Sequence, residues 1–347
     1  MKLTSFLKKE ANWIKEKGED SDIIVSSRIR LARNLKNYPF PARSKKELQK
    51  KIRDEIISKI KKISYLKNSE IFLIEELTPT DKRFLVERHL ISYDLAKSKN
   101  IGAIVIGDNE ILSIMVNEED HLRIQGLNPG LNLFDTYNIV SVVDDELSKL
   151  LSYAYSEEFG YLTSCPTNVG TGMRASVLLH LPAIVKTNQI NMLLESLTRL
   201  GMVARGFYGE GTKSLGDFFQ VSNQITLGLS EREIVDKLER VVKEIIKKEK
   251  EVRESYYKRE KFEIEDRVLR SYGVLKYAVK LSYQELMERI SYLRMGIGLG
   301  IKLPVTIELI NKIMLLSQPA HLEERLGKSL NFNEQEIERA KLVKSFL

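Results

Sequence analysis

Five arginines in four short polar segments, widely separated along the sequence, are candidates for binding an anion. An arginine side chain stays charged at physiological pH and binds phosphate oxygens through a planar fork of donors. Five of them at a single site, if the fold brings them together, would suit a nucleoside triphosphate held without a P-loop. They are Arg28 and Arg30 in SSRIRLARN (residues 26–34), Arg123 in VNEEDHLRIQGLNPG (116–130), Arg174 in SCPTNVGTGMR (164–174) and Arg205 in VARGFYGEGTKSLGDFFQ (203–220).

Two glutamates in these segments, Glu119 and Glu210, offer carboxylates to a cationic acceptor. Glu119 is the middle of three consecutive acidic residues that precede His121, and a metal site is the obvious alternative for such a cluster. The spacings that zinc sites and EF-hands use are lacking, while an ordinary polar loop stays open for this segment. Arginines for an anionic donor beside carboxylates for a cation indicate transfer of an anionic group to a cationic acceptor.

Cys165, the single cysteine, precedes a proline and two glycines in the third segment. A cysteine with positive neighbours holds a thiolate, because nearby cations lower its pKa. Taken alone, a buried and unreactive cysteine is the more ordinary interpretation. The glycines around Glu210 favour a loop between two strands; its Lys213 follows a threonine, so the segment is not a P-loop. The GIGLG run at 296–300 follows a helix instead of a strand and does not indicate a dinucleotide site.

Strand-like and helix-like segments alternate over about residues 21–228, which indicates an α+β domain with a largely antiparallel sheet flanked by helices. In a strand over 21–32, Arg28 and Arg30 project from one face. Two like charges side by side repel each other unless an anion covers them, although a solvated strand edge is equally open. Further expectations are strands at 71–77, 103–107 and 111–116 (joined by a turn at Asp108-Asn109), 160–165, 201–208 and 217–228, a helix at 81–99 and a loop over 116–130.

The character of the sequence changes near residue 228, after which nearly every segment has helical periodicity. Ser230 with Glu233, and Ser282 with Glu285, form capping boxes that mark helix starts. The expected organisation is an N-terminal helical lead-in over 1–20, a catalytic domain over 21–252 and an all-helical C-terminal domain over 253–347.

The composition is that of a globular protein, with 43% hydrophobic and 30% charged residues in a chain of 347. The net charge of +7 would permit nucleic-acid binding. However, the lysines mostly alternate with glutamates, as on solvated helix faces, so no direct nucleic-acid role is expected. A single cysteine fits a reducing compartment. With no secretion signal and no membrane-length apolar segment in the sequence, we expect a soluble cytoplasmic protein without membrane contact.

The four segments resemble, in the same order, those of the phosphagen (guanidino) kinase family: SSRIRLARN, VNEEDHLRI, CPTNVGTGMRASV and RGFYGEGT. Creatine and arginine kinases carry a helical domain ahead of these segments, whereas here the helical extension follows them. That arrangement is similar to the bacterial protein arginine kinases of this family, which phosphorylate arginine side chains in proteins and so mark them for an ATP-dependent protease. The resemblance implies the guanidino-kinase fold and an ATP-dependent protein arginine kinase.

The resemblance also implies roles for individual positions. Glu119 would be the catalytic base, Glu210 would fix the acceptor guanidinium, and Cys165 would contact the same group. ATP would bind with Mg²⁺ held mainly through its phosphates, and no protein metal site is implied. The implied ATP-binding residues are the five arginines above together with Ser27, Ile29, Leu31, His89, Ala175, Ser176, Val177, Leu178, Gly206, Phe207, Tyr208 and Gly209.

The chain departs from the family pattern at three places. Met115 stands where creatine and arginine kinases have a tryptophan, and Leu178 stands where they have a histidine, with His180 two residues further on. Protein arginine kinases also carry an RDxxRA motif that binds phosphoarginine as an allosteric signal. Only its final Arg339 and Ala340 are present here, so that regulation stays open.

The resemblance implies partners as well as chemistry. They are arginine-bearing protein substrates, including a transcriptional repressor and misfolded proteins, a zinc-binding activator protein and an ATP-dependent protease, with a homodimer or higher homo-oligomer acting in protein quality control under stress. Two other functions stay open at this stage. One is a kinase of a small free guanidino compound such as arginine, and the other is an inactive adaptor that binds phosphoarginine or nucleic acid. The intact glutamate pair favours an active enzyme.

Overall fold

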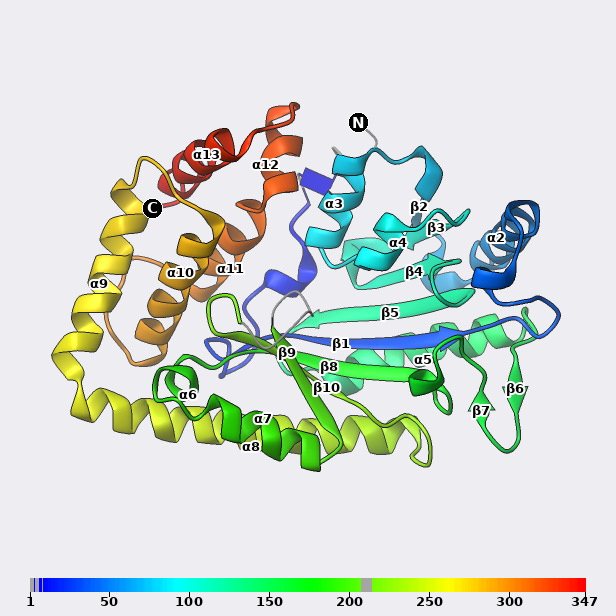
Figure 1. Cartoon of the computed structure of the whole chain (residues 1–347), viewed down its shortest axis with the longest axis horizontal. Coiled ribbons are helices and arrows are strands. Elements are labelled where there is room, and N and C mark those ends of the chain that lie inside the picture. Colours follow the sequence, from blue (N-terminus) through cyan, green and yellow to red (C-terminus); the bar gives the residue numbers. More distant parts are fainter. Residues whose placement is uncertain (1–2, 4–5, 8, 207–213) are drawn as a thin grey trace.

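One fully antiparallel sheet of eight strands organises the residues that the computed structural model describes, namely 3, 6–7, 9–206 and 214–347 (Figure 1). Every neighbouring pair of strands runs antiparallel, so the predicted α+β fold with a largely antiparallel sheet is confirmed. In spatial order the strands are β2 (Glu70–Leu73), β3 (Ala103–Ile106), β4 (Leu112–Val116), β5 (Leu122–Pro129), β1 (Ile24–Arg33), β8 (Met173–His180), β10 (Phe218–Asn223) and β9 (Met202–Gly206).

Helices cover one face of this sheet and bury its apolar side chains. In β1, Ile29 and Leu31 point to this face and are fully buried. Arg28 and Arg30 alternate onto the opposite face, as the two-residue period of a strand requires. Burying an aliphatic side chain of this size stabilises a fold by about 1.5–3 kcal/mol. The covering helices are α2 (Lys46–Ile60), α5 (Leu133–Ser148) and α8 (Glu231–Arg259), with α6 (Pro182–Lys186) packed on α8 and α7 (Ile190–Arg199) on β9.

Two groups of helices lie on the other face, on either side of the middle strands in Figure 1. One group packs its Phe84 and Leu85 with Ile104 of β3. The C-terminal group packs with Leu178 of β8 and Phe218 of β10. Helix α12 contacts α3 and so joins the two groups. The first group is α3 (Pro79–Glu87) and α4 (Tyr93–Lys97), and the second is α9 (Lys261–Tyr277), α10 (Tyr283–Gly298), α11 (Ile307–Leu316), α12 (Pro319–Leu326) and α13 (Phe332–Lys344).

Strand β5 shows that the loop expected over residues 116–130 is wrong. Only the turn at 117–121 leaves the sheet, and the chain then re-enters it between β4 and β1. Leu122 and Ile124 alternate onto the buried helix-covered face, which places Arg123 and Gln125 on the other face. Two outward polar side chains and the closing Gly-Leu-Asn-Pro residues hid this two-residue period in the sequence.

The helix expected over 81–99 is also wrong as a single element, because α3 ends at Glu87. His89 adopts a left-handed backbone with φ of 61°, a conformation that is uncommon for a residue with a side chain. A second helix, α4, then starts after Ser92, whose hydroxyl accepts a hydrogen bond from the Leu95 backbone N–H at 3.0 Å. The break takes His89 out of the helical register.

The other expected strands have mixed outcomes. The hairpin at Asp108-Asn109 is confirmed, since β3 pairs with β4. The strand expected at 71–77 ends at Leu73 and continues as a 3₁₀ turn, and β10 ends at Asn223. Of 160–165, only β7 (Gly160–Tyr161) is strand, paired with β6 (Tyr155–Ser156), because Asn34 and Asp120 bind the backbone of the residues that follow.

The 3₁₀ helices of the described residues are η1 (Asn12–Ile14), η2 (Pro41–Arg43), η3 (Ser64–Leu66), η4 (Ile74–Glu76), η5 (Asp108–Glu110) and η6 (Pro166–Asn168).

Both helix starts predicted beyond residue 228 are confirmed. Ser230 and Glu233 make a reciprocal capping box at the start of α8, and the Ser282 hydroxyl accepts from the Glu285 backbone N–H at 3.1 Å at the start of α10. Helix α8 continues through residues 252 and 253, so the predicted domain border falls inside a helix, and the division into domains stays a prediction. Among the described helices, none has the length and apolar character needed to span a membrane.

Arg33, at the end of β1, joins the sheet to the helices behind it. Its guanidinium is 1% exposed and donates to the Asp144 carboxylate of α5 at 3.0 and 2.7 Å and to Glu231 of α8 at 3.1 Å. It also donates to the Thr171 carbonyl at 2.8 Å and lies 3.5 Å from the centre of the Tyr161 ring. One buried cation therefore fastens β1, two helices and the turn that leads into β8.

We expect Arg33→Met to lower the free energy of unfolding by about 3–5 kcal/mol, because it leaves the Asp144 carboxylate buried without its partner. Urea unfolding followed by circular dichroism measures the change. The control is the double variant Arg33→Met/Asp144→Leu, which removes both charges and should be more stable than Arg33→Met alone. Equal losses in the single and the double variant would show that the ion pair is not the source of the effect.

Candidate active site

The sheet register brings the arginines of distant segments together on the face opposite α2, α5 and α8. Arg30 of β1 lies directly opposite Arg174 of β8, and Arg123 of β5 lies opposite the β1 residue two positions after Arg30. Directly opposed residues on antiparallel strands have their side chains about 5 Å apart. Arg28 belongs to the same face and donates to Gln220 of β10 at 2.6 Å. We call Arg28, Arg30, Arg123, Arg174 and Arg205 the arginine cradle.

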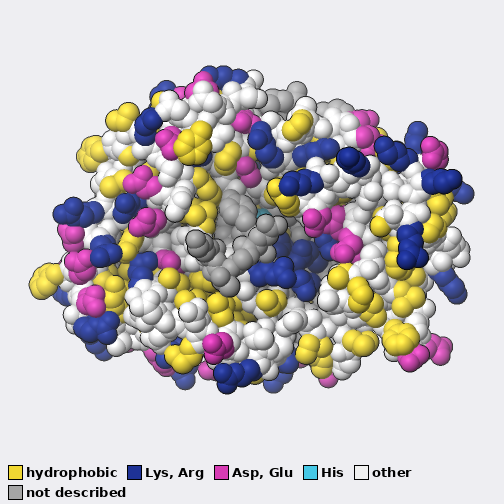
Figure 2. Space-filling view, in the orientation of Figure 1, with side chains coloured by type: hydrophobic (Ala, Val, Ile, Leu, Met, Phe, Trp, Pro, Cys, Tyr) yellow, Lys and Arg dark blue, Asp and Glu magenta, His cyan; other side chains and the backbone are white. Residues whose placement is uncertain are grey.

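A cavity of about 410 Å³ opens at the middle of this face. In Figure 2, Lys and Arg side chains lie deep in a hollow near the centre of the face, with acidic side chains at its border. Four of the five cradle arginines line the cavity, together with Glu119 and Cys165. Its lining residues are Arg30, Ala32, Asp94, Glu119, Arg123, Cys165, Thr167, Asn168, Gly172, Arg174, Val203, Arg205 and Gln224.

The cradle arginines of the three middle strands are partly buried and repel one another. Burial, Arg123 and Arg174 lower the pKa of Arg28 to about 10. Burial together with its three arginine neighbours also lowers the pKa of Arg30 well below its usual value. The Nε atoms of Arg30 and Arg174 are buried and have no hydrogen-bond partner among the described residues. A bound polyanion would remove the repulsion and accept these hydrogen bonds, so this face fits a polyphosphate.

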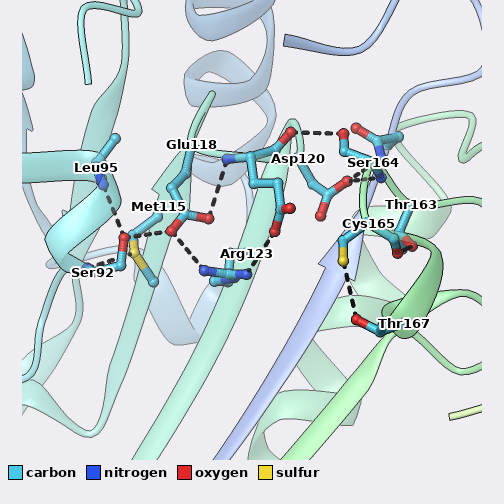
Figure 3. Close-up of polar contacts among 12 residues, drawn as sticks. Ser92, Leu95, Met115, Glu118, Asp120, Arg123, Thr163, Ser164, Cys165 and Thr167 are labelled. Carbon is cyan, nitrogen blue, oxygen red and sulfur yellow. Dashed lines mark hydrogen bonds and ion pairs between the residues drawn. The ribbon is translucent and has the colours of Figure 1, made fainter. Parts of the chain in front are cut away.

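The three carboxylates of the turn at 117–121 differ in burial and in hydrogen-bond partners. Glu118 is buried and accepts hydrogen bonds from Arg123 at 2.6 Å and from the hydroxyl of Ser92, the residue that caps α4 (Figure 3). Asp120 is fully buried and accepts from Asn34 at 2.6 Å and from the Ser164 backbone N–H at 2.7 Å. These two side chains are used to hold the turn in place.

Glu119 is the carboxylate of this turn that faces the cavity. It is 41% exposed, and its contact with Arg123 is a long one of 3.4 Å. Burial raises its pKa, as do the negative charges of Asp120, Glu118 and Asp94, while Arg123 acts in the opposite direction. A carboxylate that is accessible, loosely paired and raised in pKa is suited to accept a proton during a reaction.

Cys165 reaches the same cavity from the other side. Figure 3 shows its sulfur directed toward Thr167, and Sγ lies 3.0 Å from the Thr167 hydroxyl. The preceding Ser164 binds Asp120 through its backbone N–H and donates its hydroxyl to the Glu119 carbonyl at 2.8 Å. The turn that carries Cys165 is therefore hydrogen-bonded to the turn at 117–121, which we call the carboxylate turn.

Glycine is needed at position 172, where the turn that carries Cys165 passes close to the backbone of β1. Gly172 has φ of 63°, and a Cβ atom there would lie 2.6 Å from the Ala32 carbonyl oxygen. The close passage places Arg174 in register with Arg30 immediately afterwards. Burial, Arg205 and Arg123 lower the pKa of Arg174, whereas Cys165 and Glu119 raise it. The guanidinium of Arg174 therefore interacts both with the other arginines and with the carboxylate and the thiol of the cavity.

A second, smaller hollow of about 20 Å³ lies beside Arg28 and is lined by His89, Ser176 and Leu178 among others. Burial and the charges of Arg28 and Arg30 lower the pKa of His89 to about 3, so its imidazole is neutral at physiological pH. The His89 ring packs edge-on against Trp13 at 4.9 Å. The helix break after α3 thus brings a predicted nucleotide-site residue beside the cradle.

Other predicted nucleotide-site residues lie on the opposite face of the sheet. Ile29, Leu31, Ala175 and Val177 belong to the core packed under the helices. Ser27 is fully buried, and its hydroxyl donates to the Gly130 carbonyl at 2.8 Å. These residues shape the strands that carry the arginines, and their side chains do not line either hollow.

Four predicted residues, Glu210, Phe207, Tyr208 and Gly209, lie outside the described part of the chain, and Gly206 is the buried end of β9. Arg339 and Ala340 lie on α13, where Arg339 is 2% exposed and donates to the Ser317 carbonyl at 2.9 Å and the Leu281 carbonyl at 3.0 Å. Arg339 therefore holds α13 against the chain segments around α10 and α11.

The two positions that depart from the family pattern differ in surroundings. The Met115 sulfur accepts a hydrogen bond from the Ser92 backbone N–H at 3.3 Å in the core under α4. Leu178 lines the hollow beside Arg28, while His180 is fully buried against Ser291 of α10 at 2.9 Å. His180 therefore does not take the place of a histidine at position 178.

The structure adds cavity residues that the sequence did not single out. Asp94, in the first turn of α4, and Gln224, just after β10, line the cavity. Asp94 reaches the cavity because the chain breaks at His89 and a second helix starts after Ser92, which the single helix predicted over 81–99 did not include. Asn168 also lines the cavity. It lies three residues after Cys165, within the segment SCPTNVGTGMR, so its proximity to Cys165 in the sequence could have identified it.

Two family models match the chain in succession. Residues 47–252 match the model described as ATP:guanido phosphotransferase, C-terminal catalytic domain, and residues 261–347 match the protein-arginine kinase McsB C-terminal domain. Among solved structures, the chain is similar to lombricine kinase, with a TM-score of 0.59 and 24% identity over 70% of each chain. The duplicated taurocyamine kinase from Schistosoma mansoni gives a TM-score of 0.58 and 25% identity over 70% of this chain and 36% of that one.

Curated relatives are similar over nearly the whole chain. A protein-arginine kinase of Caldanaerobacter subterraneus subsp. tengcongensis is 46% identical over 94% of this chain and 98% of its own length. Those of Desulforamulus reducens and Bacillus subtilis are each 44% identical over 97% of this chain and cover 95% and 93% of their own lengths, respectively.

We expect Arg30→Met to raise the free energy of unfolding without ligand by about 1 kcal/mol, because it removes a buried charge that faces like charges. Saturating tripolyphosphate, at about a hundred times its dissociation constant, should stabilise the unsubstituted protein by about 2.7 kcal/mol and the variant by clearly less. Thermal unfolding with and without tripolyphosphate measures both effects. Arg270→Met, at an exposed ion pair of α9, is the control. Equal stabilisation of all three proteins would show that the cradle does not bind the anion.

Proposed function

This chain belongs to the ATP:guanido phosphotransferase family and, within it, to the protein-arginine kinases, and on that premise we propose which of its residues carry out the transfer. It is an enzyme that uses ATP and phosphorylates arginine side chains of proteins. In our proposal the arginine cradle binds the phosphates of ATP, Glu119 is the general base, and Cys165 contacts the acceptor guanidinium. Glu210 is proposed from its place in the motif alone, since it lies outside the described residues.

The observation that carries this proposal is one cavity with two kinds of wall. Partly buried arginines of β1, β5 and β8 and the exposed Arg205 of β9 form one side, and Glu119, Asp94 and Cys165 stand at its border. An anionic donor and a cationic acceptor must meet for phosphoryl transfer to arginine, and this cavity offers complementary charge to both. Positioning and charge stabilisation supply most of the catalysis in such transfers.

On the donor side, the cradle stabilises charge that builds on the transferring group. The guanidinium donors are held in place before the reaction by the sheet register and by contacts such as Arg28 with Gln220. Donors that are fixed in advance cost no reorganisation during the reaction. Removing one such donor typically costs about 2.7–4 kcal/mol of transition-state stabilisation.

On the acceptor side, a guanidinium has no free lone pair until it loses a proton. Glu119 would take a proton from the attacking nitrogen while the new N–P bond forms. The bond between the γ-phosphorus and the β–γ bridging oxygen breaks at the same time, and ADP leaves with the electron pair. The Cys165 sulfur, held by the fastened turn, would contact another edge of the same guanidinium and fix its orientation.

We propose that Mg²⁺ binds mainly through the ATP phosphates. Within the described residues, no group of three or more His, Cys, Asp or Glu side chains is close enough together to hold a metal ion. When bound with ATP, Mg²⁺ would neutralise part of the charge of the phosphates. The protein's own contribution to phosphate binding is the arginine cradle.

The biological setting of the enzyme is also a proposal. The family resemblance supports a cytoplasmic role in protein quality control under stress, with substrates that include a transcriptional repressor and misfolded proteins. It also supports a zinc-binding activator protein, delivery to an ATP-dependent protease and assembly into a homodimer or higher oligomer. The single cysteine agrees with a reducing compartment.

We expect Glu119→Gln to lower kcat by about 10²–10⁴-fold while ATP still binds, because the amide keeps the shape of the side chain but cannot accept the proton. The assay incubates the protein with Mg²⁺, ATP and an arginine-rich protein, with free arginine in a parallel sample. Acid-labile phosphate on each acceptor is then measured by phosphorus NMR, and ATP binding by calorimetry.

Retained turnover in Glu119→Gln would remove Glu119 from the role of base. Label on free arginine with none on the protein would instead assign the chain to kinases of small guanidino compounds. Glu118→Gln is not a suitable control, because Glu118 holds Arg123. Glu157→Gln, in the loop of the β6–β7 hairpin, removes one exposed carboxylate away from the cavity and should leave kcat unchanged.

The pH dependence of kcat/KM should report the raised pKa of Glu119. The base must be ionised, so activity falls as pH decreases through a pKa that lies above the ordinary glutamate value. Asp94→Asn removes a negative charge that disfavours ionisation of Glu119, which lowers the pKa of Glu119 and shifts the acid limb to lower pH. Added salt should diminish the shift, because Asp94 is exposed. Asp145→Asn, on α5 at the opposite face, should not move the limb; if it does so equally, the shift is not due to the cavity.

A further inference from the structure

An apolar groove runs between α7 and α8, on the side of the sheet opposite the arginine cradle. A cavity of about 560 Å³ is lined there by Leu193, Leu197, Leu200, Val241 and Ile245 with a few polar residues. A neighbouring cavity of about 420 Å³ shares Leu200 and Val241 and continues the groove. No described part of the chain fills either space.

Large apolar side chains remain exposed in this groove and on the elements beside it. Leu200 lines both cavities and is 48% exposed. Met192 at the start of α7 is 62% exposed, and Ile225 beside Gly201 is 46% exposed. Single exposed apolar residues are ordinary, but a contiguous apolar surface around a hollow is typical of a protein interaction site. A helix fits such a groove by its apolar stripe.

The polar rim of the groove is predominantly positive. Lys237, Arg240 and Lys248 line it and form no ion pair within the described part of the chain. Two acidic residues also line the groove. The carboxylate of Glu233 accepts the Ser230 backbone N–H and hydroxyl at 2.7 Å each, and Glu244 is exposed among the cations, which outnumber it. Lys243 is paired with Glu239 at 2.6 Å. Unpaired cations beside an apolar floor favour an occupant that carries acidic residues next to its apolar stripe.

An exposed apolar face of the chain itself, on α9, does not meet this requirement. On α9, Phe262 and Leu269 are 84% and 54% exposed. The acidic residues beside them are paired within the helix, Glu263 with Arg267 at 2.7 Å and Asp266 with Arg270 at 2.7 Å. A second copy of the chain would therefore bring few free carboxylates to the groove through this face.

We propose that the groove between α7 and α8 docks an amphipathic helix of a partner protein, with an apolar stripe flanked by glutamate or aspartate residues. The ten residues of α7 span about 15 Å, which accommodates about three helical turns. Binding on this side leaves the cavity on the opposite face open to the acceptor arginine. The groove would thus hold a substrate-bearing or regulatory protein without occupying the site of transfer.

Two synthetic peptides of about four helical turns test the proposal. Both carry leucines at alternating spacings of three and four residues; one is flanked by glutamates and the other by lysines at the same positions. Binding to the full chain is measured by fluorescence anisotropy over a range of salt. The glutamate peptide should bind, more weakly as salt increases, and the lysine peptide should bind at least about tenfold more weakly.

Substitutions then locate the binding surface. Leu200→Asp, and separately Met192→Asp, should each weaken the glutamate peptide by about tenfold or more. Arg240→Glu/Lys248→Glu should weaken the glutamate peptide and strengthen the lysine peptide. The matched control, Lys50→Glu/Lys51→Glu, makes the same charge change at exposed positions of α2 and should alter neither. Circular dichroism and basal arginine phosphorylation verify that each variant folds.

Three results would overturn the proposal. They are equal binding of the two peptides, failure of the glutamate peptide to bind, and binding that none of the groove substitutions changes. Analytical ultracentrifugation decides the remaining alternative occupant. If the unsubstituted chain is an oligomer that Leu200→Asp converts to monomers, a second copy occupies the groove instead of a partner helix.

Discussion

Electrostatic repulsion on one face of the sheet is the constraint on which the rest of this structure depends. Arg28, Arg30, Arg123 and Arg174 come from three adjacent strands, and burial with mutual repulsion lowers the pKa of several of them. A sheet can hold such a face only if its other face supplies the stabilisation. Here that face is filled by aliphatic side chains of β1, β5 and β8 packed under three helices. The middle strands therefore carry the anion-binding arginines on one side and a continuous aliphatic core on the other.

The carboxylate turn leaves one carboxylate, that of Glu119, accessible beside several cations. An isolated glutamate next to Arg123 would pair with it closely and lose its basicity. In this turn Glu118 forms that pair, and Asp120 is used by Asn34 and Ser164, so Glu119 is left accessible to the cavity. Three consecutive acidic residues are thus needed for one of them to be available.

The sequence predicted the sheet class, the common face of Arg28 and Arg30, and the helix starts at Ser230 and Ser282, because each depends on local period or capping. It missed β5 and the break before α4, since in both places the polar side chains that face the site disrupt the expected period. Which of the three carboxylates is free could not be read from adjacency at all. It is decided by Asn34, Ser92 and Ser164, which tertiary structure brings to the turn.

The C-terminal helices also belong to the framework of the cradle. Ser291 of α10 donates to Asp217 at 2.6 Å and lies 2.9 Å from His180, while Lys186 binds the same Asp217 oxygen at 2.6 Å. Asp217 immediately precedes β10, the strand whose Gln220 holds Arg28. Because a strand start fixes the register of the residues that follow, the position of Arg28 depends on contacts made by α10. The helical extension is therefore packed as part of the structure that places an arginine of the cradle, and its sequence is constrained by the active-site face as well as by its own core.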